Sequence, residues 1–93
     1  MNRENLRSVI QDDFADRLLT GEYAVHHVFP GTGRRRCCEE YGFLVAIRPA
    51  LHNEIHMHPG NTYDRLLREE CYRYWIKHIG DPQSFIDIFG GIK

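Results

Sequence analysis

Apolar residues near the start of the chain recur at intervals of three and four, which is the spacing of one face of an α-helix. Polar side chains such as Arg7, Asp12 and Asp16 occupy the positions opposite. Thr20-Gly21 follows this pattern and is typical of a helix end. We therefore expect an amphipathic helix over residues 5–19. Its apolar face consists of Leu6, Val9, Ile10, Phe14 and Leu18.

Two short segments, residues 22–29 and 43–47, are rich in β-branched, aromatic or other apolar side chains and predict β-strands. The second segment is apolar throughout, so we expect it to be buried on both faces. Pro30-Gly31 ends the first strand and predicts a loop that carries three consecutive arginines. After the second strand, Pro49 fits the first turn of a short helix that ends before Pro59-Gly60.

Two further helices are expected in the C-terminal third of the chain. Asn61 or Thr62 caps a long helix that reaches Ile79, and Asp81-Pro82 begins a last short helix. The apolar face of the long helix consists of Tyr63, Leu66, Leu67, Cys71, Tyr74 and Trp75.

The composition fits one small folded domain. Of the 93 residues, 42% are hydrophobic and 27% are charged, which excludes a disordered chain. The net charge of −1 argues against binding to nucleic acid by bulk charge alone. The order of elements predicts a single α+β domain over residues 1–93. Its parts are an N-terminal helix in 1–21, a strand–strand–helix core in 22–58 and C-terminal helices in 61–93.

We expect a cytoplasmic protein that does not enter a membrane. The longest uninterrupted apolar run, residues 43–47, is far shorter than a membrane-spanning helix. The first five residues contain no apolar stretch of the kind that a signal peptide needs. Cys37, Cys38 and Cys71 cannot all pair, so we expect reduced thiols in loops or in the core.

Histidine is the unusual part of the composition, because five of the six histidines lie between positions 26 and 58. His52 and His56 are four residues apart on the predicted short helix, so their side chains share one face. If this helix folds back onto the first strand, one strand histidine completes a set of three nitrogen ligands. A catalytic metal needs such a set, with the remaining positions open to water and substrate. Each histidine pair alone is also common at surfaces and in cores that hold no metal.

Several segments resemble the HNH (ββα-metal) endonucleases, and in particular a group of small phage-encoded members of that family. The segments are HHVFPGTGRRR, EEYGFLVAIRP, LHNEIH, YDRLLREE and FIDIFGG. The resemblance covers about residues 22–90 and joins the histidine spacing to landmarks outside the site. It implies an α+β fold in which a ββα-metal hairpin and helix is flanked by an N-terminal helix and C-terminal helices.

The resemblance also implies a role for each histidine. His26, His52 and His56 correspond to the ligands of one divalent metal ion (zinc, magnesium, manganese or nickel), and His27 corresponds to the general base. His58 is an alternate ligand or a neighbour of the ligands. The implied activity is hydrolysis of DNA phosphodiesters by an endonuclease or nickase of little sequence specificity. Guanidinium groups suit bidentate contacts with phosphate, and the expected contacts are Arg34, Arg35, Arg36 and Arg48.

Two departures from the family pattern leave other functions open. The family's middle Asn, which orients the general base, would fall near Phe43, and the cysteine pair of many phage relatives has no counterpart in residues 12–21. We therefore expect Leu6, Ile10 and Phe14 to close the core or to contact the second subunit of a homodimer. The alternatives to a nuclease are a binding protein of the same fold, directed at a host or phage protein or at DNA, and a zinc-stabilised structural protein.

Overall fold

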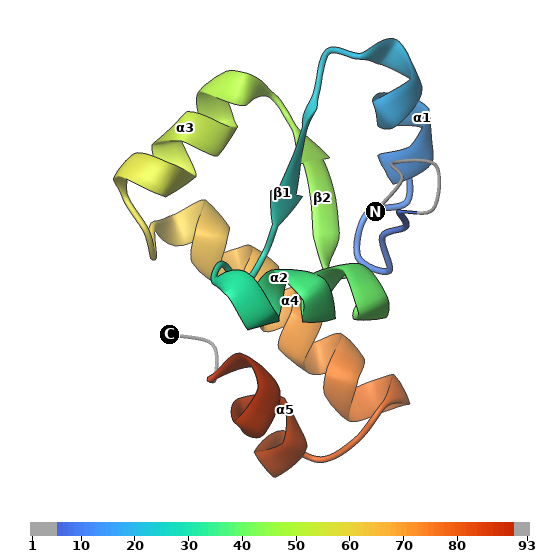
Figure 1. Cartoon of the computed structure of the whole chain (residues 1–93), viewed down its shortest axis with the longest axis vertical. Helices are drawn as coiled ribbons and strands as arrows, with labels where there is room; N and C mark the ends of the chain where they lie inside the picture. The colour runs from blue at the N-terminus through green and yellow to red at the C-terminus, as the bar shows by residue number, and fades with distance from the viewer. Residues whose placement is uncertain (1–5, 91–93) are drawn as a thin grey trace.

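The computed structural model describes residues 6–90, and it confirms an α+β fold (Figure 1). Within these residues, five helices surround one antiparallel sheet of two short strands. The elements in order are α1 (Phe14–Thr20), β1 (Ala24–His27), α2 (Thr32–Tyr41), β2 (Leu44–Ile47), α3 (Pro49–Met57), α4 (Thr62–His78) and α5 (Pro82–Phe89). The predicted order is therefore present, with one additional helix, α2, between the strands.

The two strands pair along their whole length and place the end of β1 between two helices. Ala24 pairs with Ile47 at one end, and His27 pairs with Leu44 at the other. All four residues of β2 are buried, as its uninterrupted apolar segment predicts. In Figure 1, α3 and α1 lie on either side of the sheet and α2 crosses near the end of β1. β1 contacts both α2 and α3.

The segment predicted to be an arginine-bearing loop is the helix α2, so that prediction is wrong. Gly31, at φ 114°, precedes the helix, and its carbonyl accepts the N–H of Arg35 at 2.8 Å. Arginine has one of the higher helix propensities, so three arginines in a row extend a helix readily. Cys38 lies on the face of α2 that is buried in the core, and Gly42, at φ 80°, ends the helix. Gly31 and Gly33 are typical of a turn, so the sequence predicted a loop where α2 begins.

The N-terminal helix is shorter than the predicted 5–19, because α1 begins only at Phe14. The hydroxyl of Ser8 accepts two backbone N–H groups, at 3.2 and 3.0 Å, and so forms a turn. The side-chain amide of Gln11 then bonds both backbone groups of Ala46. It accepts the N–H at 2.7 Å and donates to the carbonyl at 3.2 Å. The chain before Phe14 therefore runs beside the outer edge of β2 instead of forming a helix.

The packing predicted for this segment is confirmed, although most of it is not helical. Phe14 is only 2% exposed, and Leu6 and Ile10 are half-buried against the core. Residue 5, where the predicted helix begins, lies outside the described residues. The segment thus closes the edge of the sheet from within the same chain.

Replacing Gln11 with alanine is expected to lower the free energy of unfolding by about 1–3 kcal/mol, because the N–H of buried Ala46 would lose its partner. Urea denaturation measures this change. Gln83 of α5 is the matched control, since it is exposed and bonds to Asp87 across one helical turn. Gln83→Ala should change stability by less than about 0.5 kcal/mol. Equal losses in the two variants would show that the bridge to the strand edge contributes nothing.

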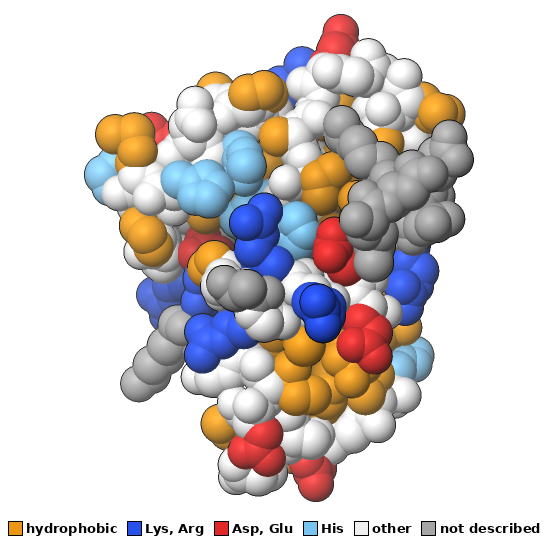
Figure 2. All heavy atoms as spheres, in the orientation of Figure 1, with side chains coloured by type: hydrophobic (Ala, Val, Ile, Leu, Met, Phe, Trp, Pro, Cys, Tyr) orange, Lys and Arg blue, Asp and Glu red, His pale blue; other side chains and the backbone are white. Residues whose placement is uncertain are grey.

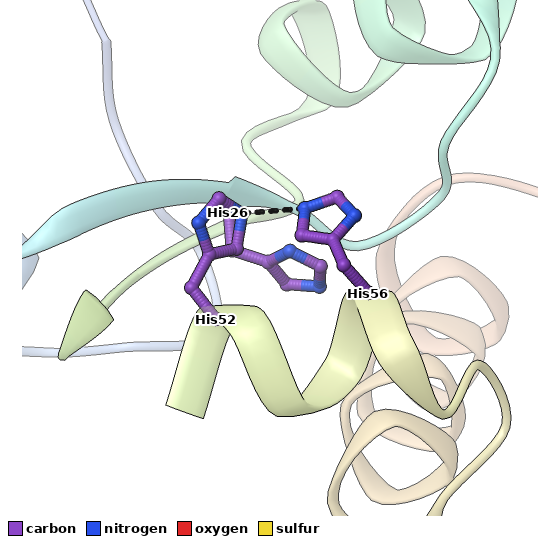
Figure 3. Close-up of side chains that lie close together, drawn as sticks. All are labelled: His26, His52 and His56. Atoms are coloured by element: carbon purple, nitrogen blue, oxygen red, sulfur yellow. Dashed lines mark hydrogen bonds between the residues drawn. The ribbon is translucent and has the colours of Figure 1, made fainter. Parts of the chain in front are cut away.

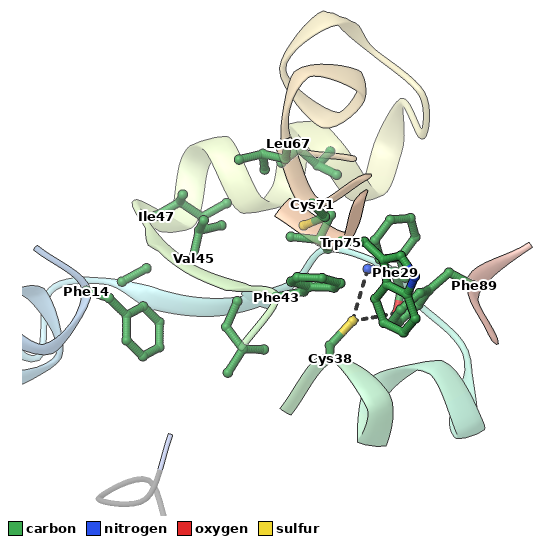
Figure 4. Close-up of a cluster of buried hydrophobic side chains, with 14 of the residues drawn as sticks. Phe14, Phe29, Cys38, Phe43, Val45, Ile47, Leu67, Cys71, Trp75 and Phe89 are labelled. Atoms are coloured by element: carbon green, nitrogen blue, oxygen red, sulfur yellow. Dashed lines mark hydrogen bonds between the residues drawn. The ribbon is translucent and has the colours of Figure 1, made fainter. Parts of the chain in front are cut away.

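Aromatic side chains of the core join the sheet to α4 and α5 (Figure 4). Phe29 follows β1, and its ring centroid lies 4.7 Å from that of Phe89 and 5.5 Å from that of Phe85. The indole N–H of Trp75 donates to the Ser84 hydroxyl at 2.9 Å and ties α4 to α5. Because Phe29 is two residues beyond β1, this cluster also fixes the end of that strand.

The buried face of α4 differs from the predicted apolar face at its start. Leu67, Cys71 and Trp75 are buried as predicted, but Leu66 is 52% exposed and Asp64 is only 1% exposed. A carboxylate therefore takes a core position at the N-terminal end of this helix. Neither α4 nor any other helix within residues 6–90 combines the length and the apolar character needed to cross a membrane.

Candidate metal centre

Three histidines from two elements converge at the junction of β1 and α3 (Figure 3). Pro49 occupies the first turn of α3, and the helix runs unbroken to Met57. His52 and His56 consequently project from one face of α3, with their Nε2 atoms 2.9 Å apart. The ring of His26 on β1 faces both, at centroid distances of 5.3 and 6.2 Å. One ligand nitrogen of each histidine lies within 4.8 Å of the other two, which is close enough to hold one metal ion.

His26 has the environment expected of a metal ligand. It is 4% exposed, and its Nε2 is a buried nitrogen with no hydrogen-bond partner among the described residues. Such an atom costs free energy unless something bonds to it. Burial, and then the charge of His52, lower the pKa of His26 to about 4, so the imidazole is neutral at pH 7. A neutral ring with an unpartnered nitrogen fits a divalent cation, because a metal ligand must offer a lone pair.

The contact between the two helix histidines also fits an ion. Nε2 of His52 and Nε2 of His56 can share a hydrogen bond only if one of them carries the proton. Burial, followed by the charges of His56 and His27, lowers the pKa of His52. Loss of the shared proton would leave two lone pairs directed at the same region. The three histidines therefore offer three nitrogen donors to one region, and all three line the same cleft.

This cleft has a volume of about 250 Å³ and lies at the end of β1. Its walls include the three histidines, His27, Gly31 at the start of α2, and two arginines. On the face drawn in Figure 2, histidine side chains gather in one area with Lys and Arg side chains beside them. The arginines that line the cleft are Arg35 of α2 and Arg68 of α4.

His27 lies beside the three-histidine cluster but turns toward a different helix. Consecutive side chains of a strand point to opposite faces. His26 accordingly faces α3, whereas Nε2 of His27 lies 3.6 Å from Oε1 of Glu39 on α2. Burial, and then the positive charge of Arg35, lower the pKa of His27, and Glu39 opposes this effect. A half-buried imidazole that is neutral at pH 7 and open to the cleft can accept a proton from a water molecule.

The three consecutive arginines point in three directions because they lie on a helix, which turns about 100° per residue. Arg35 lines the histidine cleft. Arg34 lines a second hollow with Ile88, and its guanidinium lies against Gly90, which caps the C-terminus of α5. Arg36 is exposed and lines neither hollow. The prediction placed all three in one loop of the site; the helix directs only Arg35 into the cleft.

Two other predicted site residues lie outside the cleft. Arg48 precedes α3, with its guanidinium 4.9 Å from the centre of the Tyr23 ring and 3.9 Å from a carboxylate oxygen of Glu22. Arg48 lies one helical turn before His52, and the backbone carbonyl of Arg48 accepts the N–H of His52. His58 follows the end of α3, is exposed, and is not a member of the three-histidine cluster.

Three residues of the cleft and its surroundings escaped the sequence-based prediction: Glu39, Asp64 and Arg68. Asp64 accepts hydrogen bonds from the N–H of Gly60 at 2.8 Å and from Nε of Arg68 at 3.2 Å. A signal for Asp64 was present, because it shares the three-and-four spacing of Leu67 and the later buried residues of α4. Glu39 had no such signal, since its neighbour His27 is reached only once α2 is known to be a helix.

Asp64→Ala is expected to lower the free energy of unfolding by roughly 3 kcal/mol, because it removes the carboxylate partner of a largely buried guanidinium. It also leaves the N–H of Gly60 without its acceptor. Thermal denaturation followed by circular dichroism measures the loss. Asp87→Ala is the control: this carboxylate is exposed and accepts from a surface amide. If the two variants unfold at the same temperature, the buried pair does not stabilise the start of α4.

Comparison with known proteins adds no assignment: no family model, no curated protein and no solved structure matches this chain.

Proposed function

We propose that this protein is a metal-dependent endonuclease or nickase that hydrolyses phosphodiester bonds of DNA with little sequence specificity. The observation that carries the proposal is the unpartnered buried Nε2 of His26, directed at two further histidines in an open cleft of the described residues. A histidine used only for packing would have its ring nitrogens bonded or exposed. The proposal is supported by the HNH-like spacing of the histidines in the sequence.

The three-histidine cluster would hold one divalent cation. His26 would be presented by β1, which pairs with a buried strand, and the other two donors by α3. When bound, the cation supplies positive charge that stabilises the phosphorane-like transition state and the leaving oxygen. Three protein ligands leave room for substrate, which distinguishes this site from a closed structural zinc site.

His27 would accept the proton of the attacking water. It lines the cleft, and its side chain points to the other face of β1 from the three-histidine cluster. It could therefore serve as a base while the three ligand positions stay occupied. The charged side chains that line the cleft are Arg35, Arg68 and Asp64. Guanidinium groups suit the phosphate backbone, which carries no sequence information, and so they favour little base specificity.

DNA or protein binding without cleavage is the second candidate. It is favoured by Phe43, which is fully buried in the aromatic core where the resembled family has an Asn that orients the base. In this chain the ring of His27 has Glu39 beside it instead. A protein that has lost catalysis would retain the fold and the metal ligands but not a productive base.

Incubation with supercoiled plasmid separates the two candidates. The purified protein is first treated with a chelator and then supplied with magnesium, manganese, nickel or zinc. We expect conversion to the nicked form with at least one metal, and none with the chelator or with a His52→Ala preparation purified in the same way. Retention of the plasmid in a gel-shift experiment, with no nicking under any metal, would establish the binding function and overturn the nuclease.

A further inference from the structure

The wall of the cleft includes the start of α2 as well as the histidine cluster. Gly31 and Arg35 both line the cleft, one helical turn apart. Gly31, which has no side chain to cap the first turn, precedes the helix. The N–H of Arg35 is bonded back to the carbonyl of Gly31 at 2.8 Å. The N–H groups before it belong to the first turn, where a helix offers them no internal acceptor and its dipole is positive.

A helix start alone is not a binding site, but here a second feature points to a ligand in the same cleft. His26 is only 4% exposed, its Nε2 has no partner in the described part of the chain, and its ring forms part of the cleft wall. A folded chain keeps such an atom unsatisfied chiefly where a bound group completes it. The cleft therefore contains an unpartnered nitrogen on its β1 side, and Gly31 and Arg35 bring the start of α2 to the same cleft.

The charges around the cleft favour an anion on the α2 side. Asp64, the carboxylate in the wall, already accepts from Arg68 and from the N–H of Gly60. Glu39 lies next to His27, 3.6 Å from its Nε2. Arg35 is exposed enough to reach a ligand, and its positive charge is felt at His27. The cationic side chain of Arg35 is therefore the charged group of the cleft that lies on α2 itself.

We propose that the first turn of α2 and the guanidinium of Arg35 form a phosphate subsite, which holds the scissile phosphate of a nucleic-acid backbone against the histidine cluster. That the ligand is a nucleic-acid backbone rests on the proposed function. That the subsite binds phosphate does not depend on it. Backbone N–H groups at a helix start and a planar guanidinium both donate to the non-bridging oxygens of a phosphate. The cleft volume of about 250 Å³ is small for a whole organic ligand and suits a single phosphate with its nearest sugar atoms.

The consecutive arginines supply a matched pair of variants. Arg35 and Arg36 are both exposed, adjacent on α2 and identical in charge, but only Arg35 lines the cleft. Arg36 lies outside the cleft and can still contact a DNA backbone elsewhere, so the probe must be small enough to report the cleft alone. Inorganic phosphate meets this requirement.

The test is a titration of the chelator-treated, metal-free protein with inorganic phosphate, followed by ¹H–¹⁵N NMR. We expect the backbone amide signals of residues 32–34 to shift most. Arg35→Ala should weaken phosphate binding by about tenfold or more, as loss of a bidentate charged contact implies. Arg35→Lys keeps the charge without the bidentate geometry and should fall between the two. Arg36→Ala should stay within about twofold of the unaltered protein.

The outcomes distinguish failure of the subsite from failure of the nuclease. Equal weakening in Arg35→Ala and Arg36→Ala, or amide shifts centred outside α2, would overturn the subsite. Undiminished plasmid nicking by Arg35→Ala would overturn it too and leave the nuclease standing. Phosphate binding that depends on Arg35, in a protein that nicks no plasmid with any metal, would keep the subsite and remove the nuclease.

Discussion

Replacing His27 with alanine is expected to abolish plasmid nicking, with a loss of about 10²–10⁴-fold in rate, the usual contribution of a general base. Metal affinity should stay within a few-fold of the unaltered protein. The reason is the alternation of side chains along β1, which turns His26 toward α3 and His27 toward Glu39 on α2. The measurement combines a nicking time course with isothermal titration of the metal.

Variants of the other histidines complete this test. His26→Ala and His52→Ala should lose both metal binding and nicking, because each removes one donor of the three-histidine cluster. His78→Ala is the control: this exposed residue ends α4 and contacts the ring of Tyr74, and it should change neither property. If His27→Ala and His26→Ala lose metal affinity equally, His27 is a ligand and not a base. Undiminished nicking by His27→Ala would leave the proposed catalytic role without support.

The parts of the fold that sequence alone predicted are those determined by residues close to one another in the chain. Asn61 accepts the N–H of Asp64, and Asp81 accepts the N–H of Ser84, as expected of residues that begin helices. Pro49 occupies the first turn of α3, which sets the direction of His52 and its neighbour one turn later. Because these signals are local, the placement of His52 and His56 on one face of α3 follows from the order of the residues in the chain.

The parts that sequence did not predict depend on contacts between distant segments. Gln11 prevents an early start of α1 only because Ala46, 35 residues later, presents an unpaired strand edge to its amide. Asp64 can be buried only because Arg68 and Gly60 satisfy it there. A pattern of apolar positions contains neither interaction. The contact between Glu39 and His27 was not predicted for the same reason, because it forms only when the segment of Glu39 is the helix α2.

The burial of His26 depends both on local sequence and on contacts between distant segments. Its position in a strand could be predicted, but its exposed fraction of 4% comes from pairing with Val45 and from α3 packing over β1. Burial keeps the ring neutral and leaves its nitrogen without a partner among the described residues, and these are two properties that a metal ligand needs. The chemistry of the site is therefore a consequence of tertiary packing acting on a pattern present in the sequence.

Binding of a divalent ion is also expected to raise the thermal stability of the protein. Zinc at a free concentration 100 times its dissociation constant should stabilise the native state by about 2.7 kcal/mol. For a domain of 93 residues this corresponds to a rise in Tm on the order of 10–20 °C, which a chelator should reverse. His56→Ala should abolish the rise with little effect on the metal-free protein, because the side chain of His56 is exposed.

His58→Ala decides whether the exposed histidine after α3 takes part. The cluster of His26, His52 and His56 is complete without it, so this variant should keep the full rise in Tm. The variants share all three cysteines, so zinc bound by thiols of the unfolded chain affects every measurement equally and cancels in the comparison. A rise that survives His56→Ala but disappears in His58→Ala would move the third ligand to His58 and shift the metal toward the C-terminal end of α3.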